Sequence, residues 1–128
     1  MNLSTPEIQV KKSAEELYNF LSDFNNFEQL MPGNTDKFEI TENGFLFALK
    51  GMPTIKLKLA EKIPFSKISL GSASEQFPFT LTVHIKENGD FATANFDFNG
   101  KFNPMITMMV KKPLQKFIDT LSENIQKL

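Results

Sequence analysis

The sequence predicts an α+β protein, in which an antiparallel sheet of six to seven strands packs against one long C-terminal helix. The last quarter of the chain carries apolar residues at spacings of three and four, the period of a helix buried on one face. The middle of the chain alternates apolar and polar residues around two Asn-Gly pairs, which is typical of β-hairpins. Two short helical segments directly follow the first predicted strand. Strands and helices segregated in this way indicate the α+β class.

The N-terminal part of the chain predicts one strand followed by two short helices. Residues 5–11 alternate weakly between apolar and polar and are expected to form the strand. Ser13 and Glu16 have the spacing of a capping box, in which each side chain accepts a hydrogen bond from the other residue's backbone N–H. A second short helix is expected to stop at Pro32, which is followed by glycine.

The two Asn-Gly pairs predict the turns of two hairpins, because both residues tolerate the positive φ angles of a tight turn. With Asn43-Gly44 as the first turn, Ile40 faces Phe47 and Phe38 faces Leu49. With Asn88-Gly89 as the second turn, the inward pairs are Ile85–Ala92, Val83–Ala94, Leu81–Phe96 and Phe79–Phe98. Each hairpin then has one apolar face, which supports the pairing.

Between the hairpins, residues 55–63 alternate apolar residues with lysines and predict a half-buried strand. Glu61 shares the phase of Leu57 and Leu59, so strict alternation points its carboxylate inward, where an unpaired charge is costly. Two interpretations remain open. Glu61 is either a polar anchor or general acid inside a pocket, or it lies at a strand end or bulge and reaches water.

The last segment, residues 103–128, predicts a helix of roughly 24 residues, about 36 Å long. Asn103 suits the N-cap and Pro104 the first turn. The apolar stripe is widened in its first half only, by Met105, Met108 and Met109. These flexible side chains suit either the lining of an irregular pocket or an ordinary core.

Composition restricts where the protein works. With 128 residues, 41% of them hydrophobic and 23% charged, the chain is expected to fold as one domain over residues 1–128. No apolar run approaches the ~20 residues of a membrane span, and the N-terminus lacks the pattern of a secretory signal. Cysteine is absent, which fits a reducing compartment, so a cytoplasmic location is expected.

Charge and motifs restrict partners and cofactors. All fourteen basic residues are lysine and the net charge is −1, so nucleic-acid binding is not expected. The sequence contains no phosphate-binding loop or dinucleotide fingerprint. His84 is the only histidine, and no cluster has the spacing of metal ligands. Neither a metal nor a cofactor is expected, and the oligomeric state stays open.

Three scaffold segments resemble the SRPBCC superfamily, which includes START lipid-transfer domains, polyketide cyclases, coenzyme Q-binding proteins and birch-pollen-allergen-like proteins. They are Ser13-Ala14-Glu15-Glu16-Leu17-Tyr18, Leu30-Met31-Pro32 and Asn103-Pro104-Met105. The resemblance covers nearly the whole chain. It implies a helix-grip fold, in which a strongly curved antiparallel sheet wraps around the C-terminal helix. It also implies a cavity between sheet and helix that takes an apolar small molecule.

The residues expected to line this cavity are apolar side chains of the sheet and of the first half of the last helix. They are Phe47, Leu57, Leu59, Phe79, Leu81, Phe96, Phe98, Met105 and Met109. Glu61 and Tyr18 are the only candidates for a polar anchor. The expected function is binding or transport of a lipid, an isoprenoid or quinone, or a polycyclic compound, driven by burial of apolar area.

Two other function classes remain open. A polyketide-cyclase-like or aromatase-like enzyme would need polar groups buried beside the cavity. No credible catalytic constellation is present, because the serines have no histidine partner on their side of the predicted sheet. A protein-interaction module, similar to the chaperone-ATPase activators of the superfamily, would have a filled interior and an exposed apolar or lysine-rich patch. A binding protein is therefore favoured over an enzyme.

Overall fold

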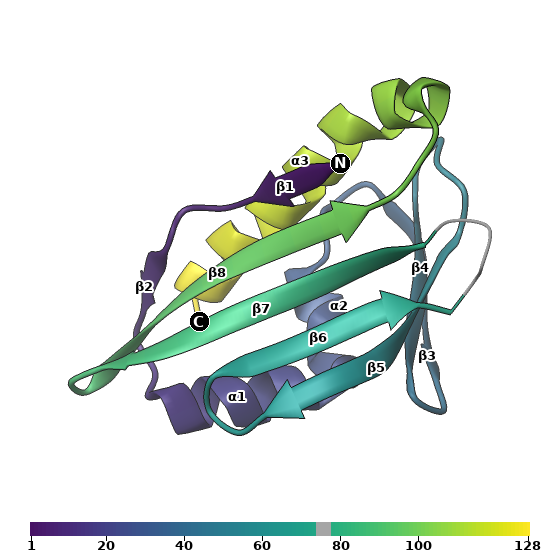
Figure 1. The fold of residues 1–128 in the computed structure, drawn as a ribbon. Helices are drawn as coiled ribbons and strands as arrows, with labels where there is room; N and C mark the ends of the chain where they lie inside the picture. Colours follow the sequence, from purple (N-terminus) through teal and green to yellow (C-terminus); the bar gives the residue numbers. More distant parts are fainter. Residues whose placement is uncertain (74–77) are drawn as a thin grey trace.

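A computed structural model describes residues 1–73 and 78–128. Within these residues, eight strands form one antiparallel sheet in the order β1-β8-β7-β6-β5-β4-β3, and β2 is a second partner of β8 (Figure 1). The strands are β1 (Asn2–Ser4), β2 (Ile8–Val10), β3 (Thr35–Thr41), β4 (Gly44–Leu49), β5 (Ile55–Ile63), β6 (Lys67–Ser72), β7 (Phe79–Asn88) and β8 (Phe91–Gly100). The predicted α+β class is confirmed.

The described sheet has more strands than the six to seven predicted, because β1 precedes the first predicted strand, residues 5–11, within which only β2 forms. β1 and β2 both pair with β8, and Pro6 lies between them. A proline has no N–H to donate to the ladder, so the strand cannot continue through it. The connection is still fastened to the sheet, since the Thr5 N–H donates to the Phe96 carbonyl and Thr5 Oγ1 accepts from the Phe96 N–H, both at 2.9 Å.

The two short helical segments form as predicted. The capping box is present at the start of α1 (Ala14–Ser22), where Ser13 Oγ accepts from the Glu16 N–H at 3.1 Å and Glu16 accepts from the Ser13 N–H at 3.3 Å. A 3-10 turn, η1 (Phe24–Asn26), leads into α2 (Phe27–Leu30), which ends before Pro32. The resulting helix pair covers part of the inner face of the sheet (Figure 1).

Both hairpins form, but each predicted register is wrong by two residues. In the first hairpin Ile40 pairs with Phe45, and Phe38 pairs with Phe47. Gly44 belongs to β4 and not to the turn. A Cβ at this position would collide with the Leu57 carbonyl of the neighbouring strand β5, so the glycine permits close strand approach.

The second hairpin turns one residue later than predicted. Asn88 pairs with Phe91, and Gly89, at φ +66°, occupies the turn. A shift of two residues keeps every side chain on its predicted face, because side chains alternate with a period of two. The inward residues of β8 are accordingly buried, namely Ala92, Ala94, Phe96 and Phe98.

The long helix α3 (Pro104–Gln126) lies against β1, β2 and β8, and α1 lies against β6, β7 and β8 (Figure 1). Asn103 caps α3 as predicted, because its Oδ1 accepts from the Ile106 N–H at 2.9 Å. The helix continues through Pro113. Its first ten residues include no buried one, and the buried residues are Leu114, Phe117, Ile118, Leu121, Ser122 and Ile125.

Stacked phenylalanine rings fill the centre of the interior. Phe47 of β4 stacks on Phe117 of α3 with ring centroids 4.7 Å apart and an interplanar angle of 14°. Phe45 stacks on Phe27 of α2 at 5.0 Å. These side chains are at most 2% exposed, so the sheet and the helices are in direct contact here. Any ligand cavity must therefore lie away from this centre.

Candidate ligand-binding cavity

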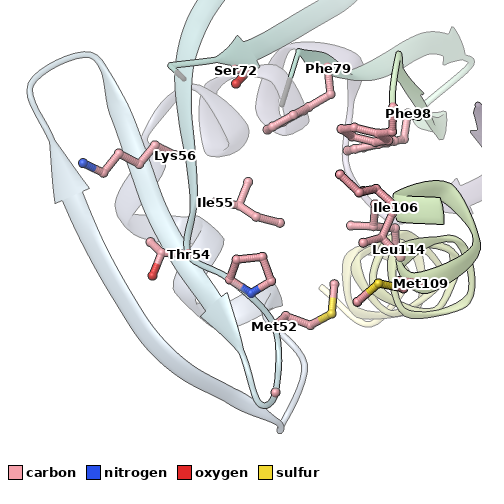
Figure 2. Close-up of a pocket in the computed structure, with 14 residues that line it drawn as sticks. Met52, Thr54, Ile55, Lys56, Ser72, Phe79, Phe98, Ile106, Met109 and Leu114 are labelled. Atoms are coloured by element: carbon pink, nitrogen blue, oxygen red, sulfur yellow. The ribbon is translucent and has the colours of Figure 1, made fainter. Parts of the chain in front are cut away.

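A cavity of about 410 Å³ lies at one end of the sheet, beside the first half of α3. The loop between β4 and β5 forms one wall and α3 forms the opposite wall (Figure 2). The lining residues are Gly51, Met52, Pro53, Thr54, Ile55, Lys56, Ser72, Phe79, Phe98, Phe102, Ile106, Met109, Val110 and Leu114. Segments far apart in sequence thus meet at a single site.

The chemistry of the cavity is dominated by apolar side chains. Phe79 and Phe98 stack with ring centroids 5.2 Å apart and an interplanar angle of 17°. Ile55 points toward Ile106 from the opposite wall (Figure 2). The amine of Lys56 points away from the space, although the lysine stem contributes to the wall (Figure 2). The site can therefore bury apolar surface, and it offers few polar contacts to a ligand.

The local sequence explains why a cavity forms at this end of the sheet. Gly100 ends β8, and a Cβ there would lie 2.6 Å from the ring of Phe102, so the glycine lets this ring fold back against the chain. Asn103 and Pro104 then start α3, which places Ile106 on the cavity wall. On the opposite side Gly51, at φ +81°, turns the loop that carries Met52.

The structure divides the nine residues predicted to line the cavity into three groups. Phe79, Phe98 and Met109 line the cavity. Four others are buried in the core away from it, namely Phe47, Leu57, Leu81 and Phe96. Leu59 and Met105 are 37% and 73% exposed, so the prediction that they face the interior is wrong. Contact of any of these residues with a ligand stays a prediction.

Irregularities of two elements explain the misplaced residues. The pairing of β5 with β6 shifts between Leu59 and Glu61, and this bulge breaks the strict alternation on which the prediction depended. The first turns of α3 lie beyond the part of the helix that the sheet covers (Figure 1). Met105 and Met108 therefore project into solvent, whereas Met109, although 68% exposed, lines the cavity.

Neither predicted polar anchor lies at the cavity. Of the two interpretations of Glu61, the structure bears out the one in which it lies at a bulge and reaches water, because its side chain is 52% exposed and its Oε1 lies 2.7 Å from Lys67 Nζ. Tyr18 is buried, but it packs edge-on against Phe65 with ring centroids 5.6 Å apart. The ammonium of Lys62 lies 5.5 Å from the centre of the Tyr18 ring. Both residues thus belong to the opposite side of the fold.

Several lining residues were not among the predicted ones. Ile106, Val110 and Leu114 belong to the helical stripe, but the stripe alone does not tell which of its members meet the sheet. Met52 and its neighbours follow a strand break, where side-chain direction has no period. These residues could not be predicted, because no local sequence pattern gives the position of the cavity along the sheet. That position depends on the packing of the whole chain.

Other site types have little support in the described residues. His84 Nε2 lies 2.9 Å from Asp97 Oδ2, and these side chains are partly exposed on the outer face of the sheet. Residues 1–73 and 78–128 contain no group of three or more histidine, cysteine or acidic side chains that could hold a metal ion. No helix in this part of the chain is long and apolar enough to cross a membrane.

Comparisons with known proteins identify the fold. No protein-family model matches the chain, and no curated protein matches its sequence. Solved structures do match. A START superfamily protein from Mycobacterium smegmatis has a TM-score of 0.70 at 16% identity, over 98% of this chain and 94% of that one.

Two further solved structures have enzyme names. Norcoclaurine synthase from Thalictrum flavum, in complex with dopamine and hydroxybenzaldehyde, has a TM-score of 0.70 at 16% identity and covers 99% of this chain and 86% of its own. The di-domain ARO/CYC protein BexL has a TM-score of 0.67 at 14% identity, over 98% and 46%. The chain therefore shares the fold of these proteins, and the predicted helix-grip fold is confirmed.

Proposed function

We propose that the protein binds an apolar small molecule in the cavity between the β4–β5 loop and the first half of α3. The observation that carries this proposal is an apolar pocket of about 410 Å³ beside a core whose centre is filled by packed side chains. Ligand sites in proteins have volumes of about 300–1,000 Å³ and mostly apolar walls. The cavity thus suits a lipid chain, an isoprenoid or quinone, or a small polycyclic compound.

The solved structures of similar fold support this proposal at the level of the class. They include a START superfamily protein and a synthase that holds two aromatic molecules. Their identity to this chain is 16%, so they do not indicate which ligand it takes. Binding rather than catalysis is the function proposed, because the cyclase-like alternative depended on Glu61 beside the cavity and Glu61 is exposed.

The exposed methionines, Met105 and Met108, agree in part with the interaction-module alternative. That alternative also requires a filled interior, and the cavity beside Phe98 does not fit this requirement. A carrier of an apolar molecule accounts for the cavity directly.

Native mass spectrometry of the purified protein tests the proposal, followed by titration with the apolar dye Nile red. A co-purified apolar molecule, or saturable dye binding that a fatty alcohol, a quinone or a sterol reverses, is the expected result. A ligand-free protein that binds neither the dye nor any compound of the panel would overturn the proposal.

A further inference from the structure

A second cavity, of about 490 Å³, adjoins the apolar one. Gly51 and Met52 line both cavities, so the two meet at the β4–β5 loop. The second cavity is lined by Pro32, Asn34, Leu49, Lys50, Gly51, Met52, Lys112, Pro113, Lys116, Phe117 and Thr120. It differs from the first cavity in its charge.

Three lysines line the second cavity, and no acidic residue does. Lys50 comes from the β4–β5 loop, whereas Lys112 and Lys116 come from α3. None of the three forms an ion pair with an acidic residue of the described ranges, 1–73 and 78–128. Their charges are therefore not neutralised by the described part of the chain.

The arrangement of these lysines is unfavourable for the protein alone. Lys112 and Lys116 are four residues apart on α3 and therefore share one face, where like charges repel. Asp119 is the nearest acidic residue of the helix. Its Oδ1 accepts from Gln115 Nε2 at 3.0 Å, and that amide also donates to the Ser4 carbonyl, so Asp119 lies toward β1. An anion placed among the three lysines would relieve the repulsion.

We propose that the ligand is an amphipathic anion whose apolar body fills the first cavity and whose carboxylate or phosphate group lies among Lys50, Lys112 and Lys116. This inference rests on the proposed function and adds the chemistry of the ligand's polar end. Lysine ammonium groups bind carboxylates and phosphates as point charges, without the paired geometry of arginine. Because Gly51 and Met52 line both cavities, the proposal places the two ends of one molecule on either side of these residues.

The test compares four probes that share one alkyl chain: lauric acid, lauryl phosphate, lauryl alcohol and methyl laurate. Dissociation constants are measured by calorimetry on the full chain and on the triple variant Lys50→Gln, Lys112→Gln, Lys116→Gln. The matched control is Lys111→Gln, because Lys111 is an exposed neighbour on α3 that lines neither cavity.

At least one of the two anions should bind about 10-fold more tightly than the alcohol and the ester at low salt. The triple variant should lose this preference and keep its affinity for the alcohol within about 2-fold, whereas Lys111→Gln should keep the preference. Added salt should weaken binding of the anion only, because the three lysines are exposed and their charges are screened.

Three results would overturn the inference. Equal affinity for the anions and the neutral probes in the unchanged protein would refute the inferred anionic group of the ligand. The proposed binding of an apolar molecule would then still stand. Absence of binding by all four probes would remove the proposed function as well. The third result concerns phosphatidylglycerol vesicles. If the triple variant no longer sediments with these vesicles but still prefers the anionic probes, the lysines act at a membrane surface instead.

Discussion

Replacement of Ile106 by tryptophan is expected to fill the apolar cavity while leaving the fold intact. Ile106 lies in the first turn of α3 and points into the cavity (Figure 2). Its backbone N–H donates to Asn103 Oδ1, and this capping bond does not depend on the side chain. The side chain is half-buried, so the larger ring can enter the empty space without displacing the packed core.

The size of the effect follows from the volume of the cavity. A sphere of 410 Å³ has a surface of roughly 270 Å², so an apolar ligand that fills the cavity gains about 7 kcal/mol before the cost of association. Tryptophan has about six more non-hydrogen atoms than isoleucine. Each of them takes the place of one ligand atom, which contributes about 0.3 kcal/mol to the binding free energy. The expected loss is about 2 kcal/mol, or roughly 25-fold in affinity.

Fluorescence titration with Nile red, and displacement of the dye by lauryl alcohol, measure this loss. Met108→Trp is the matched control, because Met108 lies on the same half of α3 but is 84% exposed and lines no part of the cavity. The control should bind the dye like the unchanged protein. The reasoning is refuted if Ile106→Trp folds and binds with unchanged affinity, or if both variants weaken binding equally.

Three further predictions concern the scaffold. Phe117→Ala removes the ring stacked on Phe47 and should lower the free energy of unfolding by about 3–5 kcal/mol in urea denaturation; a loss below about 1 kcal/mol would contradict the described packing. Gly44→Ala should cost about 1–3 kcal/mol because its methyl group meets the Leu57 carbonyl. The control is Gly33→Ala, which has open space around it and should change the free energy of unfolding by less than about 0.5 kcal/mol. Equal effects of Gly44→Ala and Gly33→Ala would refute the close approach of β4 and β5 at Gly44. Asn103→Ala removes the N-cap of α3 and should lower the free energy of unfolding by about 1 kcal/mol. Asn103→Ser keeps a side chain that can cap the helix and should retain most of this stability.

The sequence predicts the architecture well because the hairpin faces do not depend on the register. Both registers were wrong by two residues, yet Leu81 and Phe96 lie on the predicted inner face. The Asn-Gly pairs located the hairpins approximately. They did not reveal that Gly44 serves close approach of β5, because that contact joins strands from different hairpins.

The site was harder to predict than the fold, because inward direction and cavity lining are different properties. Phe47 is inward and buried, but Phe117 fills the space in front of it. Phe98 is equally inward and meets empty space, because the helix beside it is only starting. Local patterns cannot distinguish these two cases. The charge of Glu61 in the apolar phase of β5 allowed a bulge without requiring one, and the structure places it between Leu59 and Glu61.

Methyl resonances of the methionines offer the most direct test of the central claim, that the cavity beside α3 binds an apolar molecule. The protein is labelled with carbon-13 at the methionine methyl groups and titrated with lauryl alcohol. Met52 and Met109 line the cavity, and Met1 and Met31 lie outside it. The account predicts saturable shifts of the Met52 and Met109 signals, with those of Met1 and Met31 unchanged. Shifts confined to Met105 and Met108, or none at saturating alcohol, would contradict it.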